Sequence, residues 1–232
     1  METRPWVLGF AEGSAEMRAL LGNKGANLAE MVHVLGEDRV PGGFTITTAA
    51  CTSYREGGEM PDGLEGQIEE ALRALESESG RRLGDPVDPL LVSVRSGAPV
   101  SMPGMLDSVL NLGLNEAAVE GLAERSGDPH MAWDSRRRLI QMFSEVVRGV
   151  DAMAFEDALV EARHVSGVEV DSDLDQAALK ALAGRYLEIF RQQTGEDFPE
   201  DPHTQLVQAV RAVFDSWDNE RAVTYRHLNG IG

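Results

Sequence analysis

At residues 90–97 the sequence reads LLVSVRSG, an apolar run that ends in a polar turn. Pro86 and Pro89 bound the run upstream, so Leu90 to Val94 is predicted to form a buried strand. In open α/β sheets, ligands bind beyond the carboxyl ends of the strands. Arg95 follows the run directly and offers a planar, permanently charged fork of donors that suits phosphate oxygens. Phosphate binding is one interpretation of Arg95, and a structural ion pair at the strand end is the other.

The first hundred residues read as a mixture of strands and helices. Short apolar or alternating runs predict strands at residues 6–10 and 44–47, and helical spacing predicts helices at residues 22–35 and 64–75. The first of these helices places four apolar residues on one face: Leu28, Met31, Val32 and Leu35. A further short strand is expected at residues 108–114, so the opening of the chain is predicted to be α/β.

The composition changes after Asn115, where helical patterns replace strands. Asn115 is a good N-cap for a helix at residues 116–125, and Pro129 lies in the first turn of the next helix. Further helices are predicted at residues 152–163, 176–193 and 222–228, and in the stretch from Leu206 to Trp217. We therefore predict a helical subdomain at residues 116–199, inserted into an α/β subdomain made of residues 1–115 and 200–232.

The second candidate for chemistry is the turn Gly22-Asn23-Lys24-Gly25, at the start of a predicted helix. Backbone N–H groups at a helix N-terminus attract anions, and Lys24 adds a mobile positive charge. The turn does not have the spacing of a P-loop. A helix start with an exposed lysine is the simpler interpretation, and phosphate binding is the functional one.

The third candidate is the loop Ser101-Met102-Pro103-Gly104-Met105. Gly104 permits close approach of the backbone to a ligand, and the two methionines are adaptable apolar side chains. A loop of this kind can fold over a nucleotide. The simpler interpretation is a surface loop whose methionines are tucked into the core.

Composition and charge exclude several classes of protein. The net charge of −18 argues against nucleic-acid binding, which needs clustered basic residues. No apolar run approaches the roughly 20 residues that a membrane span needs, and the N-terminal residues lack the pattern of a signal peptide. The single cysteine, Cys51, cannot form an internal disulfide. These features together favour the cytoplasm.

Two further patterns are not interpreted as sites. The five histidines do not have the spacing of metal ligands, so no metal site is predicted from them. Three consecutive arginines, Arg136-Arg137-Arg138, spread around a helix and are expected to form a solvated face instead of one basic patch.

Three segments in this order resemble the ATP-grasp opening of the phosphoenolpyruvate synthase and dikinase group. They are residues 22–31 (GNKGANLAEM), 43–48 (GFTITT) and 88–98 (DPLLVSVRSGA). Residues 101–115 (SMPGMLDSVLNLGLN) resemble the pyruvate, phosphate dikinase family specifically. Residues 134–142 and 216–222 add further matches, so the resemblance spans essentially the whole chain.

The resemblance implies an α+β fold, namely a partial ATP-grasp domain from the N-terminal region of such an enzyme. The first α/β subdomain carries an inserted helical subdomain, and the third ATP-grasp subdomain is missing. The implied activity is that of a phosphotransferase, in which ATP, phosphate and pyruvate are interconverted with AMP, pyrophosphate and phosphoenolpyruvate. The phosphoryl group passes through a histidine on another domain of the enzyme.

The same resemblance assigns roles to individual residues. It implies that Lys24 and Arg95 contact the nucleotide phosphates and that Arg95 is the catalytic candidate. Ser101, Met102 and Gly104 belong to a loop over the phosphates. Arg138 is a further candidate contact, at the face that docks the histidine domain.

The resemblance also implies partners and cofactors. ATP and Mg²⁺ are the implied cofactors, with the metal ligands expected in the missing part. The full-length protein is expected to be a homodimer, and the isolated chain is expected to have little or no turnover. Two alternatives stay open: a stand-alone, non-catalytic binding module with an ATP-grasp-like fold, and a fragment of a phosphoenolpyruvate synthase.

Overall fold

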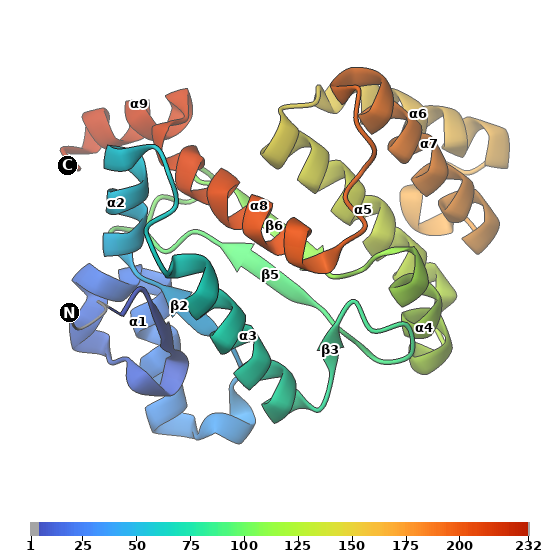
Figure 1. Cartoon of the computed structure of the whole chain (residues 1–232). Helices are drawn as coiled ribbons and strands as arrows, with labels where there is room; N and C mark the ends of the chain where they lie inside the picture. Colours follow the sequence, from blue (N-terminus) through green and yellow to red (C-terminus); the bar gives the residue numbers. More distant parts are fainter. Residues whose placement is uncertain (1–4, 232) are drawn as a thin grey trace. The chain divides into compact units, whose positions relative to one another are not determined.

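The structure is a computed structural model that describes residues 5–231 of the 232-residue chain. The described residues are mostly helical and form three two-stranded sheets, so the predicted α+β class is confirmed. The chain divides into two compact units (Figure 1). Unit 1 combines the residues up to Gly80 with Arg95–Asp107 and the residues from Arg211 onward, whereas unit 2 contains Arg81–Val94 and Ser108–Val210. The division into residues 1–115 with 200–232 and residues 116–199 stays a prediction about independently folding domains.

Unit 1 is built around a small antiparallel sheet. Its elements are β1 (Val7–Gly9), α1 (Arg18–Leu35), β2 (Phe44–Ile46), α2 (Thr48–Gly57), α3 (Leu64–Ser79), the end of α8 (Pro202–Asp215) and α9 (Glu220–Asn229). Strands β1 and β2 pair with Leu8 opposite Thr45. Helix α3 packs on β1 and α1 packs on β2. The Gln67 side chain in α3 accepts hydrogen bonds from the N–H groups of Trp6 and Val7, at 2.7 and 3.1 Å, and so fixes the start of the sheet.

The buried face of α1 differs from the expected one. Met31 and Leu35 are 44% and 45% exposed, and of the four apolar residues expected on one face only Val32 is buried. The buried side instead consists mainly of small residues, among them Ala26 and Ala29. A Cβ atom at Gly25 would lie 2.8 Å from the Thr45 Oγ1 atom in β2, so the close approach of helix and strand requires glycine. The prediction relied on the spacing of large apolar residues and ignored glycine and alanine. It therefore placed the wrong face of α1 against the core.

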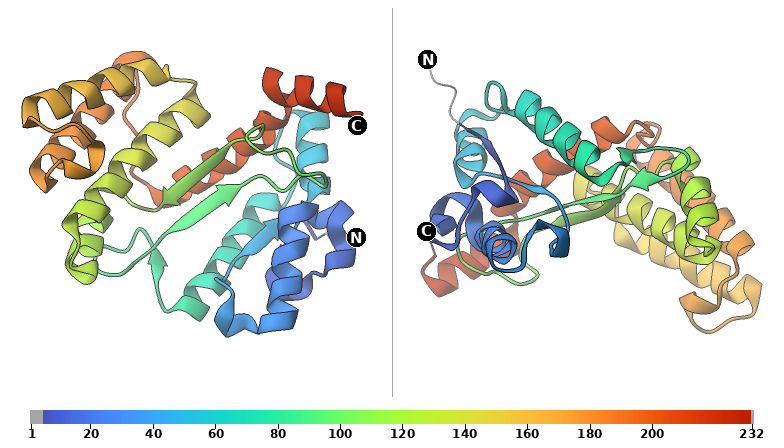
Figure 2. Two further views of the ribbon diagram at one scale, coloured as in Figure 1. Left: turned by 180° about the vertical axis from the view of Figure 1, so that it is seen from behind. Right: turned by 90° about the horizontal axis from the view of Figure 1, so that it is seen from below.

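Unit 2 places four helices beside two small sheets. Its strands are β3 (Arg82–Leu83), β4 (Pro89–Leu90), β5 (Val92–Arg95, whose last residue belongs to unit 1) and β6 (Ser108–Leu112). Its helices are α4 (Glu116–Ser126), α5 (Pro129–Arg148), α6 (Ala152–Ser166), α7 (Gln176–Thr194) and the start of α8. Strands β3 and β4 pair in parallel, and β5 pairs with β6. Helix α5 packs against β6, α4 and α7, and α6 packs on α7 (Figure 2).

Side-chain caps fix where the helices of unit 2 begin. The Asn115 side chain accepts a hydrogen bond from the Ala118 N–H group at 2.8 Å, which confirms the predicted N-cap. Asp128, Asp151 and Asp175 cap α5, α6 and α7 in the same way. Each cap satisfies a backbone donor that has no partner inside its helix.

Two of the three consecutive arginines are buried, so the expected solvated face is wrong for them. Arg136 and Arg137 are 2% and 3% exposed, and only the Arg138 side chain, 59% exposed, faces solvent. The Arg136 guanidinium donates to the Leu114 carbonyl oxygen at 2.8 Å and pairs with the Glu200 carboxylate. A buried arginine is tolerated because its donors are satisfied in this way.

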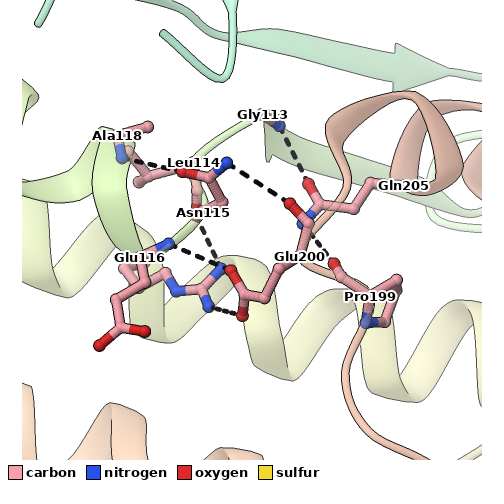
Figure 3. Close-up of polar contacts among 9 residues, drawn as sticks. Gly113, Leu114, Asn115, Glu116, Ala118, Pro199, Glu200 and Gln205 are labelled. Carbon is pink, nitrogen blue, oxygen red and sulfur yellow. Dashed lines mark hydrogen bonds and ion pairs between the residues drawn. The ribbon is translucent and has the colours of Figure 1, made fainter. Parts of the chain in front are cut away.

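A polar network around Glu200 joins two distant segments of unit 2 (Figure 3). One Glu200 carboxylate oxygen accepts from the Glu116 N–H group at 3.1 Å. The Gln205 side chain accepts from the Gly113 N–H group at 3.1 Å and donates to the Pro199 carbonyl oxygen at 2.7 Å. The network therefore fixes the segment before α8 against the junction of β6 and α4.

We predict that Arg136→Met lowers the free energy of unfolding by about 2 kcal/mol, because the Leu114 carbonyl and the Glu200 carboxylate lose their donor. Denaturation in urea measures this change. The control is Arg185→Met, because the pair between Arg185 and Glu188 is exposed on both sides and is expected to contribute under about 0.5 kcal/mol. Equal stability of Arg136→Met and the unchanged protein would show that the network contributes little to folding.

Candidate functional site

Two of the predicted motifs touch each other through their backbones. The Asn23 N–H group donates to the Ala98 carbonyl oxygen at 2.8 Å. Gly22 has φ +69°, and a Cβ atom there would lie 1.3 Å from the Gly97 carbonyl oxygen. Only glycine fits this position, both for its conformation and for the contact. We call these four residues the glycine junction; it lies within unit 1.

Lys24 and Arg95 flank the glycine junction in the sequence, next to Asn23 and two residues before Gly97. Both side chains are exposed. Among residues 5–231, neither side chain forms an ion pair; in the same unit Arg55, Arg211 and Arg221 are paired, whereas Arg18, Arg39 and Arg73 are not. The structural ion pair considered for Arg95 is therefore not found within this range. In a chain with a net charge of −18, the backbone junction thus has two exposed cationic residues next to it in the sequence, and their role in binding an anion stays a prediction.

At least one backbone N–H group of the turn at residues 22–25 already donates a hydrogen bond within the protein. The Asn23 N–H group donates to Ala98, so it is not free to bind an anion. Anion binding at this helix start would consequently depend on the Lys24 side chain and on the N–H groups that follow Asn23.

The loop between the junction and β6, residues 99–107, is exposed in its first part except at Met102 and half-buried at residues 105–107, and we call it the flap. Ser101 is exposed, but Met102 is only 7% exposed and so anchors the flap in the protein. Gly104 has φ +73°, and no atom lies within 4 Å of the position of a Cβ atom there. Gly104 is thus required for its backbone conformation, and it leaves open space above the flap.

Arg138 lies in unit 2, on the exposed side of α5, where it pairs with Asp134 at 2.7 Å. Lys24, Arg95 and the flap all lie in unit 1. The assignment of Arg138 to the same site therefore stays a prediction.

The described part of the chain offers neither a cluster of metal ligands nor a membrane-spanning helix. Residues 5–231 contain no group of three or more histidine, cysteine, aspartate or glutamate side chains that could hold a metal ion. No helix within this range is both long enough and apolar enough to cross a bilayer.

Comparison with known proteins decides the family. The family described as "Pyruvate phosphate dikinase, AMP/ATP-binding domain" matches residues 56–232. The chain belongs to this family. Arg95, the flap and Arg138 lie inside the matched range of the dikinase family domain, and the Lys24 turn precedes it.

Individual relatives extend the match to the start of the chain. The chain is 50% identical over 228 residues to the pyruvate, phosphate dikinase of Clostridium symbiosum, covering 97% of this chain and 26% of that protein. It is 52% identical over 231 residues to that of Rhizobium meliloti (strain 1021), again covering 97% of this chain and 26% of the relative. The chloroplastic enzyme of Mesembryanthemum crystallinum is 48% identical over 224 residues, which cover 96% of this chain and 23% of the relative. The chain thus spans about a quarter of the length of these dikinases.

Helix α2, most of which precedes the matched family domain, contacts the segment before the glycine junction, although it was not predicted from the sequence. The Thr48 hydroxyl donates to the Ala19 carbonyl oxygen at 2.7 Å, three residues before Gly22. At the other end of α2, Arg55 pairs with Asp218 at 2.6 Å. Thr47 caps the helix and was a readable signal for its start, since its side chain accepts from the Ala50 N–H group.

Cys51 lies in α2 and is half-buried. Burial raises the pKa of the Cys51 thiol to about 11, and the positive charge of Arg55 opposes this shift only in part. Only the thiolate reacts with alkylating reagents. We therefore predict that iodoacetamide alkylates Cys51 at pH 8 about 100-fold more slowly than an unperturbed thiol, with a rate that rises about tenfold per pH unit.

Mass spectrometry of the alkylated protein measures these rates. The same protein unfolded in guanidinium chloride is the matched control, because its thiol has lost the burial. Equal alkylation rates in the native and unfolded protein at pH 8 would contradict the raised pKa.

Proposed function

We propose that this chain binds the phosphates of ATP in a dikinase that converts ATP, phosphate and pyruvate to AMP, pyrophosphate and phosphoenolpyruvate. The observation that carries the proposal is the glycine junction, which brings the turn with Lys24 and the strand end with Arg95 together. Both cations are exposed and lack a carboxylate partner within the described residues. The family to which the chain belongs is described as AMP/ATP-binding, and its relatives are named as dikinases.

The two cations have different parts in this proposal. Lys24 is a compact point charge on a flexible stem and binds phosphate oxygens without a fixed geometry. Arg95 offers a planar fork of donors and keeps its charge at every relevant pH. Little covalent chemistry falls to the protein in phosphoryl transfer, so catalysis depends on positioning and on stabilising developing charge. We assign that stabilisation to Arg95 and the binding of the ground-state phosphates to both residues.

The flap closes the proposed site. Ser101 and the backbone around Gly104 would contact the phosphates, because Gly104 leaves open space on its exposed side. The Met102 side chain is buried, so its part would be to anchor the flap, with nucleotide contact through its backbone. Water is excluded from the reacting phosphates when such a flap closes.

The remaining parts of the proposal concern elements outside this site. We propose that the described residues form the first α/β subdomain of an ATP-grasp domain with its helical subdomain, and that other sequence supplies the third subdomain and the Mg²⁺ ligands. Arg138 would lie at the face that docks the phosphohistidine domain. A homodimeric state and a cytoplasmic location stay predictions.

The comparisons do not favour the two alternatives. The dikinase matches cover 96–97% of this chain at 48–52% identity, and residues 101–115 resemble the dikinase family in contrast to the synthases. The reaction distinguishes a dikinase from a phosphoenolpyruvate synthase, because a dikinase consumes phosphate and releases pyrophosphate.

The test is a coupled assay of the complete polypeptide that the gene encodes, with and without phosphate. We expect phosphoenolpyruvate formation from ATP and pyruvate to require added phosphate and to yield pyrophosphate. Phosphoenolpyruvate formation at the same rate without phosphate would instead support a synthase. The isolated 232 residues are expected to show little or no turnover in this assay.

A further inference from the structure

The end of the flap is held by a carboxylate that the site described above does not use. Asp107 lies three residues after Gly104, and its side chain is 17% exposed. Its carboxylate accepts from the Asn219 side-chain amide at 2.7 Å and pairs with the Arg221 guanidinium. Its backbone N–H group donates to the Ser216 hydroxyl at 3.2 Å. Asp107 is therefore fixed to the segment that joins α8 and α9 in unit 1.

Arg221 makes two different contacts with the end of the flap. Besides its ion pair with Asp107, its Nε–H group donates to the Met105 carbonyl oxygen at 3.1 Å. Met105 in turn donates its N–H group to the Met102 carbonyl oxygen at 3.2 Å, across the turn that contains Gly104. One guanidinium thus holds both the side chain and the backbone that follow Gly104. Lysine cannot make both contacts, because it lacks the second branch of the fork.

The segment that carries Arg221 is itself fixed to α2. Arg55 in α2 forms the ion pair with Asp218 and lies over the Trp217 ring at 5.7 Å. Arg226 lies over the same ring at 4.5 Å. Helix α2 also binds the Ala19 carbonyl through Thr48, just before the glycine junction. A rigid base of hydrogen bonds and ion pairs therefore connects the turn with Lys24 to the far end of the flap.

The flap is consequently held on both sides, and the buried Met102 side chain anchors its middle, while its other residues are exposed or half-buried. The Asn23–Ala98 hydrogen bond holds its start, and Asp107 and Arg221 hold its end. A loop with fixed ends loses less conformational entropy when it closes on a ligand than a loop with one free end. The contacts are therefore suited to prepare the flap for a ligand before that ligand binds.

We propose that Asp107 and Arg221 form a latch that presets the Gly104 end of the flap for closure over the phosphates of ATP. The latch residues are positioning residues, and they touch neither ATP nor the transferred group. This inference rests on the proposed function of the chain as an ATP-binding domain. Beyond the proposed function, it assigns to Asp107 and Arg221 an effect on ATP affinity, which they exert by positioning the flap.

The latch makes a specific kinetic prediction for the complete polypeptide. Asp107→Ala and Arg221→Lys are expected to raise KM for ATP about tenfold, because the free flap must be ordered on binding, and to change kcat less than about threefold. Asp107→Asn keeps an acceptor oxygen and is expected to fall between Asp107→Ala and the unchanged protein. The double variant Asp107→Ala/Arg221→Ala should lose more than Asp107→Ala or Arg221→Ala alone but less than their sum. The two residues share one ion pair, whereas the Asn219 contact of Asp107 and the Met105 contact of Arg221 are separate.

The experiment combines these kinetics with hydrogen–deuterium exchange of peptides covering residues 99–105. Arg211→Ala is the matched control, because Arg211 pairs with Glu65 at 2.9 Å on the surface of the same unit. We expect faster exchange in the flap for both latch variants and no change for Arg211→Ala. Unchanged flap exchange in Asp107→Ala, or additive effects in the double variant, would overturn the latch.

The test still gives an answer if a variant does not fold or if the unchanged protein does not bind ATP. If Asp107→Ala does not fold, Asp107→Asn and Arg221→Lys answer the same question with smaller changes. If the unchanged protein does not bind ATP, the proposed function is wrong. The hydrogen–deuterium exchange of the flap peptides then still shows whether Asp107 and Arg221 hold the flap. Normal ATP binding together with unchanged flap exchange would reject the latch and keep the proposed function.

Discussion

Arg95→Ala is expected to lower kcat/KM for ATP-dependent phosphoenolpyruvate formation about 10³-fold in the complete polypeptide. Arg95 is exposed and has no ion-pair partner among residues 5–231, so its charge is available to the phosphates of a ligand. Most of the loss should fall on kcat, because charge on the transferring group develops in the transition state. Steady-state kinetics with varied ATP separates kcat from KM.

Two control variants define the role of the Arg95 fork. Arg95→Lys keeps the positive charge but loses the planar pair of donors, so its activity should lie between that of Arg95→Ala and that of the unchanged protein. Arg73→Ala removes an exposed arginine of α3 in the same unit and is expected to leave activity unchanged. Activity of Arg95→Ala within about threefold of the unchanged protein would exclude Arg95 from catalysis.

Gly22→Ala is expected to destabilise the chain by about 4 kcal/mol. The added Cβ atom would lie 1.3 Å from the Gly97 carbonyl oxygen, and the φ of +69° is one that alanine rarely adopts. The turn must therefore move away from the strand end, which also separates Lys24 from Arg95. Urea denaturation measures the loss of stability, and ATP titration under folding conditions measures the loss of affinity.

Gly184→Ala is the matched control for Gly22→Ala. Gly184 lies inside α7, and no atom lies within 4 Å of the position of its Cβ atom. The same chemical change should there stabilise the chain by about 0.5–1 kcal/mol, because alanine favours the helix. A loss for Gly22→Ala no larger than about 1 kcal/mol would mean that the glycine junction is not rigid.

Most elements of the fold could be predicted from local sequence. The strands near residues 7, 44 and 108 and the helices from α3 onward appear where periodicity and caps indicate them. The single buried strand predicted at residues 90–94 is wrong in part: it is divided into β4 and β5, which belong to different sheets, and none of residues 90–94 is buried. Helix α2 was missed, because it is short and Tyr54 is its one large apolar or aromatic side chain. The buried face of α1 and the burial of Arg136 and Arg137 were predicted wrongly. The α1 face depends on Thr45 and the burial of Arg136 on Glu200, and both partners are distant in the sequence. Arg137, in contrast, pairs locally with Asp134.

The candidate site was predictable as separate motifs, and its assembly was not. Lys24, Arg95 and the flap follow from residue type and from the family resemblance. The hydrogen bond between Asn23 and Ala98 has no local signal, because it joins two turns that are distant in the chain. The latch between Asp107 and Arg221 is invisible for the same reason. Contacts between residues that are distant in the chain, whether through backbone or side chains, cannot be predicted from the local patterns of a single sequence.

The central claim is that Lys24 and Arg95 act together on one polyphosphate. Its most direct test is an equilibrium titration of ATP into the complete polypeptide, comparing Lys24→Ala/Arg95→Ala with Lys180→Ala/Arg185→Ala. The second pair removes the same charge from unit 2, where both side chains are paired with glutamates. We predict that the first double variant loses at least about 100-fold in ATP affinity and that the second loses less than about threefold. Equal ATP affinities of the two double variants would contradict the claim.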